Sequence, residues 1–396
     1  MSWTLWSANT PASFCNGSQP EMPTSNRPLR ILHIILALKP TNGQYNEHCL
    51  PMRNKRDITI CTYFKSTVTP PTGITLFDGD NSLRGFHRAL RAALRDREYD
   101  VIHVHTPHAG VLLLMTLLLS GSYRKLAPST VHTIQNSFQN FKLRNKLLFI
   151  PSFVYFRRLV FCSDASYESF PAFLKWLGAG RMSVVQNAVD LDRVDRLARV
   201  GAAAPSDQFT LATVGLIAIK NPLTVLAAFR QSHDRAGKLV LIGEGNQRPL
   251  LAREIEQAGL QKDVELTGMI ERDSVFERFV RADVFVSASW GEGLPVAVLE
   301  AMACRRPVIL SDIPPHREIA EGVSFIPLLK PDDVGGFARE IRKFREMGAS
   351  EREKTGQDCR KLIEDRFSLP VMHAGYARVY AQITGNKVPA LLEEIG

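Results

Sequence analysis

The chain has 396 residues, of which 45% are hydrophobic and 22% charged, a composition that excludes wholesale disorder. This length exceeds what a single hydrophobic core usually supports, so two domains of roughly 150 to 200 residues each are expected. The formal net charge of +9 comes from an excess of basic side chains in residues 1–200. The six cysteines form no Cys-x-x-Cys pair, which predicts reduced thiols in a cytoplasmic protein.

The first half of the chain carries no segment that predicts a membrane span. Residues 1–27 lack an apolar run of signal-peptide length and are predicted to be a mobile tail. The apolar run at residues 109–119 is about half of the roughly 20 residues needed to cross a bilayer, so it predicts a buried helix.

A basic stretch covers residues 101–163, which contain no Asp or Glu. Its cations are Arg124, Lys125, Lys142, Arg144, Lys146, Arg157 and Arg158. Such a stretch suits anionic lipid, a phosphorylated acceptor or nucleic acid, or is simply a solvated face. We expect peripheral contact of the first domain with anionic membranes and no nucleic-acid partner.

Short apolar runs alternate with longer helical patterns along the chain, which predicts an α/β protein with parallel sheets. The first series of predicted strands covers 29–36, 58–64, 101–105, 130–134 and 159–163, and the second covers 209–214, 238–242, 264–267, 284–287, 307–311 and 323–327. The pattern fades near residues 198–208, so the domains are predicted at 28–203 and 204–396. The C-terminal helix is expected to pack back on the first domain. Two doubly wound, Rossmann-like domains would face each other across a cleft at the carboxyl ends of their strands.

The segment with the strongest chemical signal is residues 282–311, which reads as strand, Gly-bearing turn, helix and strand. Pro295 suits the first turn of the helix, and Gly293 allows a close approach of the backbone to a ligand. The N–H groups of Gly293, Leu294 and Val296 would form an anion site. Glu292 and Glu300 are either ligand-binding carboxylates or a cap and a structural ion pair.

The spacing from Glu292 through Gly293, Leu294 and Pro295 to Glu300 resembles the Glu-x7-Glu motif of the retaining glycosyltransferases of family 4, which have the GT-B fold. Residues 184–194, 239–251, 264–270 and 311–319 resemble further segments of that family in the same order. The resemblance covers nearly all of the second domain and is looser in the first. It implies that residues 28–203 form the acceptor side and residues 204–396 the donor side.

The resemblance implies roles for both glutamates. It implies that Glu292 contacts hydroxyls of the donor sugar and that Glu300 holds the ribose of the nucleotide. A buried carboxylate can accept two charge-assisted hydrogen bonds from ribose hydroxyls. Gly293 and Leu294 would then meet the sugar and diphosphate, and Met269 lies in the segment that resembles the family's nucleobase side.

Residues 213–223 resemble the diphosphate-binding loop of the family, which normally carries an Arg shortly before a Lys. Lys220 matches the Lys, but Leu216 or Ile217 stands in place of the Arg. Half of the usual cationic clamp is therefore missing. The alternative for Lys220 is a surface lysine near a turn.

In the first domain, His132 in a predicted strand resembles the histidine that the family places beside the donor sugar, although a lone His is more often structural. His103 and His105 are interpreted as core or rim residues. Gly43, after Thr41 and Asn42, stands in place of the family's Gly-Gly loop.

The Asp78-Gly79-Asp80 segment resembles the metal-binding Asp-x-Asp motif of the other major glycosyltransferase fold. Asp-Gly between an apolar run and a helix is a common turn and N-cap arrangement, and we interpret it so. The GT-B resemblance requires no metal and no cofactor, because the nucleotide sugar is a substrate.

The predicted function is transfer of a sugar from a nucleotide-sugar donor to a glycan, lipid-linked or small-molecule acceptor, with retention of configuration. His132, Lys220 and Glu292 are the predicted catalytic residues, and Gly43, Met269, Gly293, Leu294 and Glu300 the predicted donor-binding residues. Two rivals stay open: a nucleotide-sugar epimerase of the same architecture, and a non-catalytic donor-binding subunit of a polysaccharide assembly complex.

Overall fold

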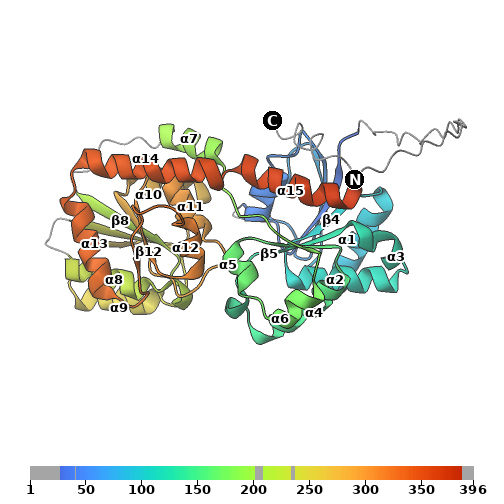
Figure 1. Cartoon of the computed structure of the whole chain (residues 1–396), viewed down its shortest axis with the longest axis horizontal. Helices are drawn as coiled ribbons and strands as arrows, with labels where there is room; N and C mark the ends of the chain where they lie inside the picture. Colours follow the sequence, from blue (N-terminus) through green and yellow to red (C-terminus); the bar gives the residue numbers. More distant parts are fainter. Residues whose placement is uncertain (1–26, 41, 201–207, 233–236, 386–396) are drawn as a thin grey trace, which may run out of the picture.

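The computed structural model describes residues 27–40, 42–200, 208–232 and 237–385, which form two units, each built on a parallel sheet (Figure 1). The first sheet has the order β3-β2-β1-β4-β5-β6-β7. Its strands are β1 (Arg30–Ile35), β2 (Asp57–Thr62), β3 (Ile74–Phe77), β4 (Val101–Val104), β5 (Thr130–Ile134), β6 (Arg158–Phe161) and β7 (Met182–Val184). The predicted tail lies outside the described residues, apart from Arg27.

The second sheet has the order β10-β9-β8-β11-β12-β13. Its strands are β8 (Phe209–Val214), β9 (Gly237–Ile242), β10 (Val264–Leu266), β11 (Val284–Ser287), β12 (Val308–Ser311) and β13 (Leu328–Leu329). Both sheets are parallel in every described pairing, so the expected α/β class with Rossmann-like sheets is confirmed. The predicted domain boundary at 203 and 204 lies outside the described residues.

Helices connect the strands of the first sheet, except β2 and β3, which an irregular segment joins. They are η1, a π-helix (Gln44–Cys49), α1 (Leu83–Asp96), α2 (Pro107–Leu119), α3 (Tyr123–Leu126), η2 (Ala127–Ser129), η3 (Phe138–Asn140), α4 (Leu143–Tyr155), α5 (Asp164–Glu168) and α6 (Ala172–Leu177). Ser82 and Thr106 cap α1 and α2 by accepting from the N–H groups of Gly85 and Ala109. α1, α2 and α4 cover one face of the sheet through a single apolar core.

The second unit follows the same plan. Its helices are α7 (Leu191–Val200), η4 (Ala218–Lys220), α8 (Pro222–Ser232), α9 (Arg248–Gln257), α10 (Arg272–Arg281), α11 (Val296–Ala303), α12 (Pro314–Ile319), α13 (Val334–Glu346) and α14 (Ala349–Arg366), followed by α15 (Leu369–Thr384). Apolar clusters lie on both faces of the second sheet.

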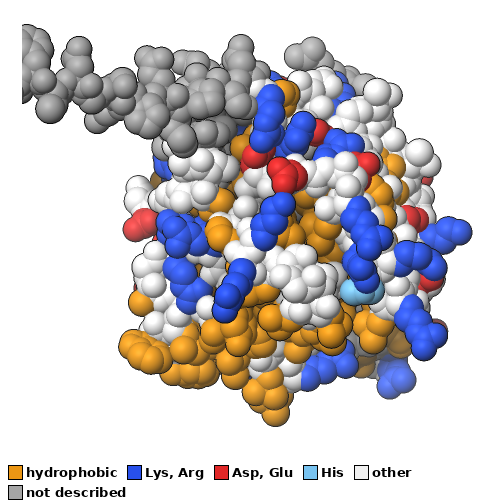
Figure 2. Space-filling model, turned by 90° about the vertical axis from the view of Figure 1, so that its right-hand side faces the viewer, with side chains coloured by type: hydrophobic (Ala, Val, Ile, Leu, Met, Phe, Trp, Pro, Cys, Tyr) orange, Lys and Arg blue, Asp and Glu red, His pale blue; other side chains and the backbone are white. Residues whose placement is uncertain are grey.

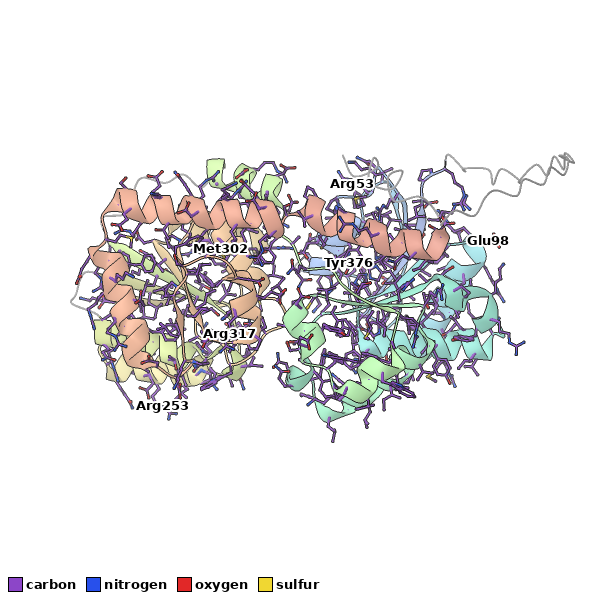
Figure 3. All side chains as sticks on the ribbon, viewed as in Figure 1. Arg53, Glu98, Arg253, Met302, Arg317 and Tyr376 are labelled. Carbon is purple, nitrogen blue, oxygen red and sulfur yellow. The ribbon has the colours of Figure 1, made fainter. Side chains whose placement is uncertain are left out.

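The last two helices belong to different units, although they follow each other closely in the chain. α14 runs along the second unit, and α15 crosses to the first (Figure 1). α15 covers the face of the first sheet opposite α1, packing Met372, Tyr376 and Tyr380 on residues of β1, β4 and β5. Tyr376 belongs to α15, and Met302 of α11 lies under α14 (Figure 3). The chain therefore closes back on its first half.

Three strand predictions were wrong. β3 and β7 were not predicted, because these edge strands are short and only half-buried, so their apolar signal is weak. Residues 323–327 are not a strand. β13 begins after Pro327, whose ring nitrogen cannot donate to a ladder.

Within the described ranges, no helix is long and apolar enough to cross a membrane. The run at residues 109–119 lies in α2, as a helix, but Met115, Leu118 and Leu119 at its carboxyl end are exposed. The prediction of a buried helix therefore fails at these three positions, although Thr116 and Leu117 between them are buried.

Candidate active site

The loop between β11 and α11 places Glu292 where the two units meet. The Glu292 carboxylate is buried and accepts two hydrogen bonds from Lys220 Nζ, at 2.7 and 2.9 Å. Ser289 Oγ donates a third, at 2.7 Å. The structure therefore brings together the two residues that sequence reasoning selected from segments about seventy positions apart.

The loop after β8 determines where Lys220 points. Gly215 has a positive φ of 94°, and the stem of Lys220 packs over it, so that a Cβ there would lie 3.1 Å from Lys220 Cγ. Asn221, also left-handed, donates to the carbonyls of Ala288 and Pro331. Leu216 is buried in the core and Ile217 is exposed, so neither supplies a polar group to the site.

The backbone at the start of α11 offers free donors beside this ion pair. The N–H groups of Gly293, Leu294 and Val296 meet no acceptor within the part of the chain that the structure describes. Unpaired N–H groups at a helix start attract anions. The loop thus combines a lysine, a carboxylate and several donors, a set that suits a sugar diphosphate.

Gly293 allows a close approach, but to the chain itself rather than to a ligand. A Cβ at this position would lie 2.5 Å from the carbonyl oxygen of Gln135, in the loop after β5. Ser137 Oγ donates to the Glu292 carbonyl at 2.6 Å, and Ser163 Oγ donates to the Gly293 carbonyl at 2.8 Å. The carboxyl ends of the first sheet therefore hold the Glu292 loop.

A second ionic cluster joins the units through Arg272, which sequence reasoning missed. Arg272 Nη2 lies 2.9 Å from Glu300 Oε1 and 3.3 Å from Glu47 Oε1, which comes from η1 of the first unit. Among the described residues no donor reaches Glu300 Oε2, so half of this carboxylate stays free. No sequence signal could link Glu47 with Arg272, because 225 positions separate them.

Burial shifts the pKa values of this cluster. Desolvation raises the pKa of Glu47 to about 7, and the neighbouring Arg272 charge opposes the shift. Desolvation also raises the pKa of Glu300, again against Arg272. For Arg272, burial lowers the pKa, but attraction to both carboxylates outweighs it, so the guanidinium stays charged.

His132 lies inside the first unit. Its ring has no exposed surface and packs between Phe149 and Phe156, with centroid distances of 6.0 and 5.3 Å. Both ring nitrogens lack partners among the described residues, and no described contact joins them to Lys220 or Glu292. A direct contact with a donor sugar would require this ring to become exposed.

The other predicted donor-binding residues have different surroundings. Gly43 is the N-cap of η1, with ordinary helical angles, and Glu47 lies 3.3 Å from the place of its Cβ. Met269 is exposed, whereas Leu294 is buried in the core of the second unit. Leu294 can therefore offer a ligand only its backbone. Thr41 lies outside the described residues.

Asp78 and Asp80 accept hydrogen bonds from neighbouring parts of the first unit. Asp78 accepts from Thr62 Oγ1 and the Ser66 N–H, and Asp80 accepts from Ser82 and Arg88. This matches the turn interpretation, except that Ser82 is the N-cap of α1. The two carboxylates have different partners.

Histidines His33, His103 and His105 form the one cluster of potential metal ligands among the described residues, with nitrogens within 4.8 Å of one another. His33 Nδ1 lies 3.0 Å from His105 Nε2. Both nitrogens of His103 are already bonded, to the hydroxyls of Tyr380 and Thr133. A metal would have to displace one of these hydroxyls, so the geometry favours a hydrogen-bonded core cluster.

Comparisons with known proteins agree with this architecture. Residues 57–193 match the family described as Glycosyltransferase Family 4, and residues 208–346 match Glycosyl transferases group 1. Together with two Rossmann-like sheets that meet at their carboxyl ends, these matches identify the chain as a glycosyltransferase of the GT-B fold that uses a nucleotide-sugar donor.

Two of the similar proteins are named as transferases that act on saccharides linked to a polyprenol through a diphosphate. The chain is 23% identical over 355 residues to the Escherichia coli UDP-Gal:alpha-D-GlcNAc-diphosphoundecaprenol alpha-1,3-galactosyltransferase, covering 85% of this chain and 88% of that protein. It is 25% identical over 344 residues to the Xanthomonas oryzae GDP-mannose:cellobiosyl-diphosphopolyprenol alpha-mannosyltransferase, covering 79% and 87%.

Solved structures share the fold. Sucrose-phosphate synthase from Thermosynechococcus elongatus superposes with a TM-score of 0.73 at 17% identity, covering 90% of this chain and 99% of that chain. Anabaena HepE in complex with UDP and glucose gives a TM-score of 0.69 at 16% identity, covering 88% and 98%.

Proposed function

We propose that this glycosyltransferase transfers a hexosyl group, with retention of configuration and without a metal ion, to a saccharide carried on a lipid diphosphate. The observation that carries the donor part is the Lys220–Glu292 pair beside the free N–H groups that start α11. Negative charge grows on the nucleoside diphosphate as the glycosidic bond breaks. Lys220 and these N–H groups stabilise it there.

In this proposal Glu292 binds the sugar of the donor, and Glu300 binds its ribose. On donor binding, the diphosphate takes Lys220, and the released Glu292 carboxylate accepts hydroxyl groups of the sugar. The proposal assigns His132 no direct contact with the donor, because its ring is buried between Phe149 and Phe156. Glu300 accepts ribose hydroxyls through Oε2, while Arg272 holds Oε1 and opposes the rise that burial causes in the Glu300 pKa.

Glu300→Gln should weaken nucleotide binding by roughly tenfold, because an amide replaces a charge-assisted acceptor. The measurement is a thermal-shift screen of nucleoside diphosphates and nucleotide sugars, since a ligand that binds only the folded state raises the melting temperature with its affinity. Glu256→Gln, on the exposed surface of α9, is the control. Equal shifts for wild type and Glu300→Gln would remove Glu300 from the donor site.

The metal-free part of the proposal follows from the cations already present. Lys220 and the helix-start N–H groups supply the positive charge that a divalent ion supplies in other transferases. Asp78 and Asp80 bind turn and helix groups instead, so Asn at both positions should cost stability only.

The acceptor part rests on the relatives, two of which act on saccharides linked to polyprenol through a diphosphate, as their names state. Such an acceptor is anchored in a membrane. The enzyme must therefore work at the membrane surface, and buried free cysteines are compatible with the cytoplasmic side.

The first unit exposes an apolar face suited to this location. Leu143, Leu147, Ile150 and Val154 form an exposed stripe along α4 at helical spacing. Leu118 and Leu119 of α2, with Phe173 and Trp176 of α6, extend the apolar face. Figure 2 shows hydrophobic side chains gathered along one edge of this unit, with Lys and Arg above them. An apolar patch beside basic residues is typical of peripheral membrane binding.

The protein should co-sediment with anionic vesicles, and Leu143→Asp with Leu147→Asp should lower the bound fraction several-fold. Each introduced charge opposes insertion of the stripe into the interface. High salt should weaken binding only partly, because the apolar contribution is not screened. Leu250→Asp, on the second unit, is the control. Equal recovery with neutral and anionic vesicles would contradict the proposal.

A further inference from the structure

An apolar pocket of about 430 Å³ lies at the carboxyl edge of the first sheet, away from the residues assigned to the donor. Its volume falls in the range of small-molecule sites, roughly 300 to 1,000 Å³. The lining residues come from the ends of β1 and β2 and from α1, α2 and α4: Leu36, Tyr63, Phe64, Leu83, His108, Val111, Leu112 and Leu148. Two of them, Phe64 and Leu83, are largely exposed although nonpolar.

The pocket and the Glu292 loop lie at the same edge of the first sheet. The walls of the pocket follow β2, β1 and β4, and the residues that hold the Glu292 loop, Ser137 and Ser163, follow β5 and β6. β4 and β5 are neighbouring strands, so the pocket and the residues that hold the Glu292 loop occupy adjacent parts of that edge.

Positive potential surrounds the mouth of the pocket. The amino ends of α1, α2 and α4 converge on it, and none of these helices has an acidic residue in its first turn. Arg144, in the first turn of α4, lies close enough to His108 to lower the pKa of that imidazole, after burial as the larger cause. Asp80, which precedes α1, is already held by Ser82 and Arg88.

The pocket is also continuous with the membrane-facing surface. Leu148 lines it from α4, next to Leu147 of the exposed stripe on the same helix. A hydrocarbon chain that lies along the α4 stripe would meet the pocket at Leu148. The apolar pocket and the α4 stripe, with Arg144 near His108, thus match a lipid with an anionic head group.

We propose that this pocket binds the isoprenoid chain of the acceptor next to its diphosphate, while the diphosphate lies among the amino ends of α1, α2 and α4 near Arg144. The proposal rests on the proposed lipid diphosphate acceptor. The pocket has space for roughly a dozen water-sized groups, so it takes the first isoprene units only. The remainder of the chain follows the α4 stripe into the membrane.

Isothermal titration with farnesyl diphosphate tests the pocket without any knowledge of the acceptor sugar. The full-length protein is titrated in the presence of a saturating nucleoside diphosphate, which blocks the donor site. We expect farnesyl diphosphate to bind at least tenfold more tightly than farnesol or inorganic diphosphate, because each lacks one half of the contacts. Loss of farnesyl diphosphate binding when nucleotide is added would place the probe in the donor site and overturn the proposal.

Variants assign the binding to the pocket. Leu83→Asp and Val111→Asp should each weaken farnesyl diphosphate binding tenfold or more and leave nucleotide affinity unchanged. Arg144→Ala should weaken the binding of farnesyl diphosphate but not that of farnesol. Leu250→Asp is the matched control, and Leu83 is exposed enough for its variant to fold. Unchanged affinity in folded Leu83→Asp and Val111→Asp would overturn the pocket assignment. Failure of nucleotide binding alone would instead count against the proposed function.

Discussion

Lys220→Ala should lower kcat/KM for sugar transfer by roughly a hundredfold or more, the usual effect of losing a leaving-group stabiliser. Lys220 is the cation that the structure pairs with Glu292, and the position where an arginine was expected carries buried Leu216 or exposed Ile217. Lys220 is therefore the only side-chain cation among residues 213–223.

The form of the loss is diagnostic. A lysine acts as a point charge here, so Lys220→Arg should recover part of the rate. Lys262→Ala, an exposed lysine of the same unit, should keep wild-type kinetics. Because Lys220→Ala also leaves Glu292 buried with only Ser289, melting temperatures must accompany the kinetics. If Lys220→Ala folds and keeps wild-type donor binding and turnover, then Lys220 does not contact the donor diphosphate.

Acidification from pH 7 to pH 5 should strongly destabilise the first unit, because its buried histidines are neutral in the folded protein. Burial lowers the pKa of His33 and of His132 to about 3, and that of His373 to about 4. Burial also holds the pKa values of His48, His103 and His105 well below the ordinary 6.5.

The direction of this pH effect follows from the number of protons that the folded and the unfolded chain bind. Between pH 6.5 and the folded pKa values the unfolded chain binds more protons, so the free energy of unfolding falls as the pH falls. At pH 5 each such histidine costs roughly 2 kcal/mol, and several together approach the total stability of a typical domain. Glu47 acts in the opposite direction, since its raised pKa of about 7 favours the folded state as the pH falls from 7 towards 4.5.

His132→Phe isolates one contribution. The His132 ring has no hydrogen-bond partner among the described residues and lies between two phenyl rings, so phenylalanine can replace it with little polar loss. The variant should melt near the wild type at pH 7 and above it at pH 5. The measurement is the melting temperature against pH, with His87→Phe in α1 as the control. Parallel curves for wild type and His132→Phe would contradict a neutral, buried His132.

The sequence was most informative where chemistry depends on short spacings. The strand-turn-helix around Glu292 is local, and its apolar and Gly-Pro pattern predicted both the fold and the position of the free N–H groups. Lys220 was predicted from the sequence of its own loop, residues 213–223. Gly293 was selected as a position of close approach, but its neighbour is Gln135, a contact between units that no local pattern encodes.

Residues brought together by the packing of two units were not predictable. Arg272 bridges Glu47 and Glu300 only because η1 and α10 meet across the units. His132 was expected beside the donor sugar, yet Phe149 of α4 covers the imidazole inside the first unit. The pocket on the first unit was also missed, since its lining comes from five separate elements.

The most direct test of the account is product analysis with the best nucleotide sugar from the thermal-shift screen and a short polyprenyl-diphosphate saccharide, with and without EDTA. The account predicts one nucleoside diphosphate released per glycosidic bond formed, the donor's anomeric configuration in the product by NMR, and equal rates in EDTA. Isomerisation of the donor without acceptor, inversion of configuration, or donor binding without transfer across an acceptor panel would contradict it. So would a rate abolished by EDTA and restored by manganese or magnesium.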